Sequence, residues 1–221
     1  IDNGQKIHKA YIIDQKTPIV KKIIDKLNKK NVKIEFVDRD FFENYNGNHQ
    51  GVMIEVDSFK YASLEDLKEA KRLILLDKIE DPHNLGAIIR SAESFAFDGV
   101  IIPEHRSAKV NPTVYKTSAG AINNIKIAMV TNLNQTIETI KKDGFWVYGL
   151  AGEAKNSLSA TNLTGKVALV VGNEGYGISR LVRDNCDELI KIPMLGKVNS
   201  LNASVAAATC MYEVLRQNDF Q

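Results

Sequence analysis

The stretch IPMLGKVNSLNASVAAATC, residues 192–210, contains the least ordinary junction in this sequence. Its opening Ile-Pro-Met is typical of the end of a strand, and the alanine-rich run 203–210 is typical of a helix. The junction between them carries four small polar residues, namely Asn199, Ser200, Asn202 and Ser204. Ser and Asn are common helix caps, but capping accounts for only one of the four. The others need a second explanation.

Upstream of this junction the sequence alternates regularly between strand and helix patterns. The predicted strands are LILLD (73–77), GVIIP (99–103), NIKIAMV (124–130), FWVYGLA (145–151), VALVVGN (167–173) and LIKIPM (189–194). The predicted helices lie around 84–97, 111–119, 133–143, 177–185 and 202–217. Several strands are apolar on both faces, which favours a parallel sheet covered by helices on both sides. Ligands bind such sheets beyond the carboxyl ends of the strands.

Two other strand ends carry residues suited to a site. Asn84 lies near the start of the helix after the first of these strands, and Arg90 follows on the same helix. The segment GNEGYGIS, residues 172–179, places Gly172 and Glu174 after the fifth strand. Taken singly, a surface arginine and a glycine turn are the simpler interpretations, and the glycine spacing matches neither a dinucleotide fingerprint nor a P-loop. Their coincidence with the polar junction predicts a ligand site.

The first 70 residues predict a separate small α/β unit. Strand patterns lie at 10–14, 32–38 and 51–56, and Thr17 and Pro18 are suited to the cap and first position of a helix. That helix carries five lysines: Lys21, Lys22, Lys26, Lys29 and Lys30. They indicate either a solvated helix face or an RNA-contacting patch. We expect a charged helical connector, SLEDLKEAKR, and domains at 1–70 and 71–221.

Composition narrows the class of protein. The chain has 221 residues, 25 % of them charged, and a net charge of +2, which is too small to indicate nucleic-acid binding by itself. It has no apolar run of about 18 residues and no signal-peptide core at its start, so neither a membrane span nor secretion is indicated. Cys186 and Cys210 stand alone, which favours reduced thiols, a cytoplasmic location and no metal site. Because position 1 is Ile, we expect that a few native residues are missing before it.

Three segments resemble the sequence motifs of the SpoU (TrmH-type) RNA ribose 2′-O-methyltransferases, in order. They are DPHNLGAIIRSAESF, LVVGNEGYGIS and IPMLGKVNSLNASVAAA, and the resemblance covers residues 73 to about 217. The first unit, including NHQGV at 48–52, is similar to the family's L30e-like RNA-binding domain. The resemblance implies a mostly parallel SPOUT sheet with a C-terminal trefoil knot. It is strongest to the branch that methylates a guanosine of large-subunit (23S) rRNA.

The resemblance also implies the cofactor, S-adenosylmethionine (SAM), and gives the polar junction a purpose. The polar residues of NSLNAS would satisfy a tightly bent backbone and hold the methionine end of SAM. Backbone groups of Gly172, Ile192 and Leu201 would contact the cofactor. The residues expected to bind SAM are Leu150, Gly152, Gly172, Ile192, Ser200 and Leu201.

The catalytic residues implied by the same resemblance are Arg90, Asn84, Glu174, Ser200 and Asn202. A guanidinium is hardly ever deprotonated, so Arg90 is expected to bind the target phosphate and lower the pKa of the ribose hydroxyl electrostatically. Asn84, Ser200 and Asn202 would orient the hydroxyl, Arg90 and the cofactor, and Glu174 would fix Arg90 or the glycine loop. Family members of this type are homodimers, with no membrane and no metal involved.

The sequence allows three other interpretations. The enzyme could methylate tRNA instead of rRNA, which lies within the same family. A non-catalytic RNA-binding or ribosome-assembly protein could retain the fold, although every motif side chain is present here. A nicotinamide-dependent enzyme is disfavoured because no GxGxxG follows the first strand of the second unit.

Overall fold

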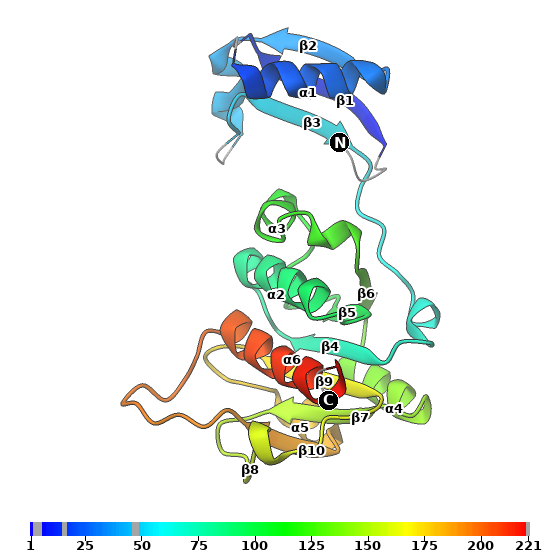
Figure 1. The fold of residues 1–221 in the computed structure, drawn as a ribbon, viewed down its shortest axis with the longest axis vertical. Helices are drawn as coiled ribbons and strands as arrows, with labels where there is room; N and C mark the ends of the chain where they lie inside the picture. The colour runs from blue at the N-terminus through cyan, green and yellow to red at the C-terminus, as the bar shows by residue number, and fades with distance from the viewer. Residues whose placement is uncertain (2–5, 15–16, 46–48, 220–221) are drawn as a thin grey trace. The chain divides into compact units, whose positions relative to one another are not determined.

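The computed structural model of the protein describes residues 1, 6–14, 17–45 and 49–219. The chain forms two compact units, Ile1–Lys60 and Tyr61–Gln221, which are drawn in Figure 1. In the described residues, no helix is both long enough and apolar enough to cross a membrane. Residues 46–48, which carry the start of the NHQGV resemblance, lie outside the described part.

The first unit is a three-stranded mixed sheet with the strand order β2-β1-β3. Its elements are β1 (Ile7–Ile13), α1 (Pro18–Lys29), β2 (Lys33–Val37), the 3₁₀ helix η1 (Arg39–Asn44) and β3 (Val52–Val56). β1 pairs parallel with β2 and antiparallel with β3. Ala10 and Ile12 alternate on one face of β1 and pack with Val20 and Leu27 of α1 to form the core. The Thr17 hydroxyl accepts from the Val20 N–H at 3.3 Å, as its predicted capping role requires.

The second unit is a seven-stranded parallel sheet with the order β6-β5-β4-β9-β7-β10-β8. Its strands are β4 (Arg72–Asp77), β5 (Gly99–Pro103), β6 (Lys126–Val130), β7 (Trp146–Leu150), β8 (Asn156–Ser157), β9 (Val167–Gly172) and β10 (Glu188–Lys191). Its α-helices are α2 (Pro82–Ser94), α3 (Pro112–Thr117), α4 (Leu133–Lys142), α5 (Arg180–Asn185) and α6 (Ala203–Asp219). Short 3₁₀ turns lie at η2 (Glu65–Leu67), η3 (Ala121–Asn123) and η4 (Leu158–Ala160).

Helices cover the parallel sheet on both faces. Alternate residues of the central strands, such as Leu73 and Leu75, pack with Ile137 of α4 and Val182 of α5 in one buried cluster. α2 packs with α3 and α6, and α6 packs on β9 (Figure 1). This two-sided burial explains the apolar runs and confirms the predicted α/β class, with a small mixed sheet followed by a parallel one. The trefoil knot stays a prediction, because strand order alone does not establish threading.

The structure differs from the predicted elements in the connector between the units. Residues 63–72 contain only the short 3₁₀ turn η2 (Glu65–Leu67) in place of a helix, and Arg72 already begins β4. Leu67 and Ala70 are buried with the core of the second unit, so this segment follows the sheet surface rather than a helical path. The compact units accordingly divide after Lys60, ten residues before the expected boundary. The two-residue strand β8 was not predicted, because alternation cannot be detected over so short a length.

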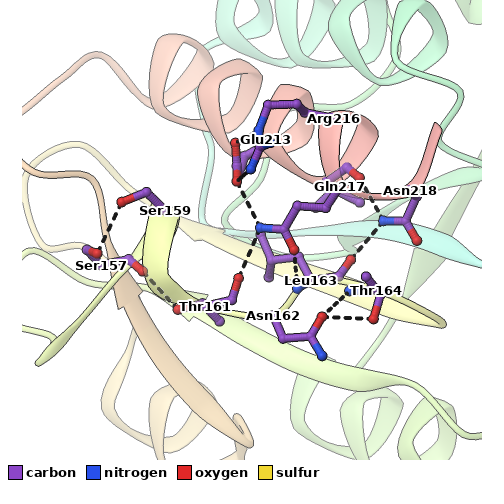
Figure 2. Close-up of polar contacts among 11 residues, drawn as sticks. Ser157, Ser159, Thr161, Asn162, Leu163, Thr164, Glu213, Arg216, Gln217 and Asn218 are labelled. Carbon is purple, nitrogen blue, oxygen red and sulfur yellow. Dashed lines mark hydrogen bonds and ion pairs between the residues drawn. The ribbon is translucent and has the colours of Figure 1, made fainter. Parts of the chain in front are cut away.

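Polar side chains anchor the C-terminal end of α6, as Figure 2 shows. The Gln217 amide donates to the Thr161 carbonyl at 3.0 Å and accepts from the Leu163 N–H at 2.8 Å. Asn218 donates to the Leu163 carbonyl at 2.9 Å. These amides supply hydrogen-bond partners to backbone that lies outside the sheet. The end of α6 is thereby tied to the segment that leads into β9.

Candidate active site and cofactor pocket

Three polar side chains from distant segments meet beyond the carboxyl ends of the strands. Asn84 lies in the first turn of α2, Glu174 in the loop after β9, and Asn202 immediately before α6. The Asn84 amide donates to Glu174 Oε1. The Asn202 amide donates to Asn84 Oδ1 at 3.0 Å and to Glu174 Oε1 at 3.1 Å. We call these three residues the polar cluster.

Local sequence explains how two members of the polar cluster are presented. Asp81 caps α2 by accepting from the His83 N–H at 2.9 Å, and the helix that follows holds Asn84 at 7 % exposure. Asn202 caps α6, because its Oδ1 accepts from the backbone N–H of Ser204 at 2.9 Å. The amide nitrogen of Asn202 is left to donate to the cluster. One side chain therefore both starts α6 and joins it to two other segments.

Glu174 is presented by a loop that folds back on itself. A side-chain carbon at Gly172 would lie 2.1 Å from the carbonyl carbon of Gly177, so only glycine fits there. Gly177 has φ +65° and donates its N–H to the Asn173 carbonyl at 2.8 Å. Asn173 Oδ1 also accepts from the Gly175 N–H at 2.8 Å. The glycines thus close the loop, and Gly172 does not line the cavity described next.

A cavity of about 160 Å³ lies where β7 and β10 end, bordered by the loop that leads to α6. Leu150 and Ile190 stand opposite each other in the β7–β10 ladder and both line it. Five of the six residues expected to bind SAM are among its walls: Leu150, Gly152, Ile192, Ser200 and Leu201. The other lining residues are Ala151, Ile190, Lys191, Met194, Asn199 and Ala206. Of these, only Asn199 had an expected role toward SAM, as one of the polar residues of NSLNAS. The expectation that ligands bind beyond the carboxyl ends of the strands could have found Ala151. The polar junction before the last helix already contained Asn199.

Arg90 makes no hydrogen bond with the three described residues of the polar cluster. Asn84 is buried, whereas Arg90, further along α2, is exposed and has no hydrogen bond or ion pair with any described residue. Glu174 accepts from Asn84 and Asn202 rather than from Arg90, one of the two partners expected for it. The Arg90 guanidinium is therefore a cation without a protein partner in the described chain.

Comparison with known proteins identifies the family. The model of the SpoU rRNA methylase family matches residues 71–212, which is more than half of the chain. The chain belongs to this family. A second model, described as the substrate-binding domain of RNA 2′-O ribose methyltransferases, matches residues 1–62.

Individual relatives agree with the family. The chain is 39 % identical over 228 aligned positions to YacO of Bacillus subtilis, which is named as a TrmH family tRNA/rRNA methyltransferase. The alignment covers 99 % of this chain and 92 % of YacO. It is 44 % identical over 183 positions to a tRNA/rRNA methyltransferase of Synechocystis, slr0955, covering 80 % of this chain and 48 % of that protein. The fold matches the crystal structure of the SpoU methyltransferase AviRb from Streptomyces viridochromogenes in complex with AdoMet, with a TM-score of 0.83. The sequence identity is 21 %, and the match covers 98 % of this chain and 85 % of AviRb.

Family membership confirms two predictions made from the sequence. The protein is an RNA 2′-O-ribose methyltransferase, and SAM is the methyl donor of its family. RNA is its substrate.

Proposed function

We propose that the cavity at the ends of β7 and β10 holds SAM and that the polar cluster borders the target ribose. The supporting observation is that five expected cofactor residues line one cavity, and that Leu201 in its wall directly precedes Asn202 of the cluster. Leu150, Ile192 and Leu201 suit the apolar face of adenine, and the hydroxyl of Ser200 suits the polar methionine end. In this assignment Gly172 acts indirectly, by shaping the loop of Glu174.

Bound SAM supplies a methyl group on a positively charged sulfur, and the protein supplies alignment and charge. Arg90 is proposed to bind the phosphate next to the target ribose and to stabilise negative charge as it develops on the 2′-oxygen. Its free guanidinium is available for that contact. Asn84, Ser200 and Asn202 are proposed to orient the hydroxyl and the cofactor. Glu174 is proposed to hold the two asparagine amides in place, so its contribution reaches the reacting atoms through them.

The proposed substrate is a guanosine of large-subunit (23S) rRNA, and tRNA is the alternative. The description of the family as rRNA methylases supports rRNA, while YacO and slr0955 are both named for tRNA and rRNA together. Incubating the protein with methyl-labelled SAM and total RNA, followed by mapping of the labelled nucleotide, tests this. Label in a guanosine of large-subunit rRNA is expected. Label confined to tRNA would contradict the proposed substrate, and no label in any RNA would favour a non-catalytic role.

The proposed assembly is a homodimer in the cytoplasm. Apolar side chains are exposed on α6 and on the loop before it, with Val205 at 49 %, Tyr212 at 49 % and Val198 at 72 %. Small residues along α6 would allow a second helix to approach closely. Neither Cys186 nor Cys210 forms a disulfide, which fits a reducing compartment. Sedimentation at micromolar concentration should give a dimer, and a fully active monomer would contradict the assembly.

A further inference from the structure

One ion pair joins the loop that forms a wall of the proposed SAM cavity to α5, and the loop also buries Ala151 and Ala154. Glu153 directly follows Gly152 of that wall, and its Oε1 contacts Arg183 Nη1 of α5. Among the described contacts, this is the only polar side-chain contact of residues 151–155. The loop also has backbone hydrogen bonds, from the Ala151 N–H to the Ile190 carbonyl at 3.0 Å and from the Ala154 N–H to the Ala151 carbonyl at 3.1 Å. A side-chain carbon at Gly152 would meet no atom within 4 Å, so nothing packs against the loop at that point.

Arg183, in contrast, stands on a well-fixed element. Its N–H donates to the Ser179 carbonyl at 2.9 Å, and the Ser179 N–H donates to Asp77 Oδ2 of β4 at 2.6 Å. The neighbouring Val182 is 3 % exposed and belongs to the core. Arg183 Nε is buried and has no hydrogen-bond partner in the described part of the chain. Glu153 is thus the acceptor that compensates a partly buried charge, and removing it leaves that charge without one.

We propose that Arg183 is a positioning residue that acts through Glu153 to hold the wall 150–152 in the geometry that SAM requires. This inference rests on the proposed SAM cavity. A loop already held in its bound geometry loses less conformational freedom when the ligand enters, so the pair contributes to affinity. Neither residue lines the cavity, and neither is assigned to the reacting atoms. Losing the pair should therefore weaken SAM binding and leave the chemical step unchanged once SAM is saturating.

The test compares full-length variants by calorimetric SAM binding and by kcat with total RNA at saturating SAM. The pair is broken in Arg183→Gln and Glu153→Gln, and it is retained in Arg183→Lys. Arg180→Gln is the matched control, because Arg180 lies on the same helix with its side chain 93 % exposed and 3.8 Å from Asp184. The side chains of Arg183 and Glu153 are 35 % and 58 % exposed, and ion pairs in contact with solvent contribute little. Each broken-pair variant should therefore raise the SAM dissociation constant by only roughly two- to fivefold. The double variant that combines Arg183→Gln with Glu153→Gln should bind SAM no more weakly than either single variant. Arg183→Lys and Arg180→Gln should bind SAM like the wild type.

Two results would overturn the proposal. One is Arg183→Gln binding SAM as tightly as Arg180→Gln; the other is a fall in kcat at saturating SAM with unchanged affinity. Circular dichroism checks that each variant is folded. If Arg183→Gln does not fold, the SAM affinities of Arg183→Lys and Glu153→Gln still compare a retained pair with a broken one. A failure of the SAM cavity itself has a separate signature. Ala206 lines the cavity, so the cavity-filling variant Ala206→Phe should bind SAM poorly if SAM occupies it. SAM binding by Ala206→Phe with wild-type affinity would contradict the proposed site, and with it the role of the ion pair.

Discussion

The surroundings of Arg90 indicate a role in catalysis and not in folding. Arg90 is exposed and unpaired in the described chain, whereas the polar residues of the cluster are bonded to one another. Replacing Arg90 therefore costs the fold little. We expect Arg90→Ala to lower kcat by about 10²-fold or more, as loss of a preorganised charge donor does, with SAM affinity unchanged. A rate assay paired with SAM calorimetry measures both. Near wild-type methylation by this variant would remove Arg90 from the mechanism.

Asn202 has two separable tasks, capping α6 and joining the polar cluster. Serine can cap a helix but lacks the amide that donates to Asn84 and Glu174. Asn202→Ser should therefore keep near wild-type stability, while Asn202→Ala should lose about 1 kcal/mol of unfolding free energy. Both should lose most of their methylation activity. Denaturant unfolding and rate assays on the two variants separate the tasks, and an active Asn202→Ser would show that the cluster link is dispensable.

At the scale of elements, the anchored end of α6 predicts a pH dependence. Hydrogen bonds from Arg216, at 2.8 and 2.7 Å, and from Gln217 lower the pKa of Glu213 below its usual 4.5 (Figure 2). A carboxylate with a lowered folded-state pKa stabilises the fold above its unfolded pKa, and that contribution is lost as pH falls through the folded value. Glu213→Gln should therefore be less stable than the wild type at pH 7, and the difference should shrink as the pH falls below about 4.

Thermal unfolding at pH 7 and pH 3.5 measures this dependence. Glu65→Gln is the matched control, because Glu65 also pairs with a cation three residues away but its side chain is 80 % exposed, against 13 % for Glu213. The control should show little effect at either pH. An equal loss of stability for Glu213→Gln at both pH values would mean that packing, not charge, carries the role of Glu213.

At the scale of the whole molecule, the two units are proposed to divide the labour of RNA binding and catalysis. Because Leu67 and Ala70 belong to the second core, an isolated catalytic unit should begin at Tyr61. A chain of residues 61–221 should fold and bind SAM, but lose most of its RNA affinity and its choice of nucleotide. A chain of 71–221 should be less stable, since deleting a buried leucine alone costs about 2–5 kcal/mol. If residues 61–221 methylate the same nucleotide with undiminished efficiency, RNA selection belongs to the catalytic unit.

The lysines of α1 allow an independent check in the full chain. Lys21 and Lys22 are exposed on that helix. If they contact phosphates, neutralising both should reduce the slope of log affinity against log salt by roughly 0.7–0.9 for each contact. An unchanged slope with altered nucleotide choice would instead indicate readout of base or shape by another part of the unit.

Periodicity in the sequence determined most elements of both units, and the strand-end rule, joined to the resemblance, picked out five residues that line one cavity. These features are local, because each depends on which face of a strand or helix is buried. Strand order and the partners of Glu174 were decided only in the tertiary structure. Asn84 and Glu174 are 90 residues apart, and Asn84 and Asn202 are 118 apart. Such contacts, like that of Glu153 with Arg183, depend on which strands become neighbours, and no local pattern encodes that.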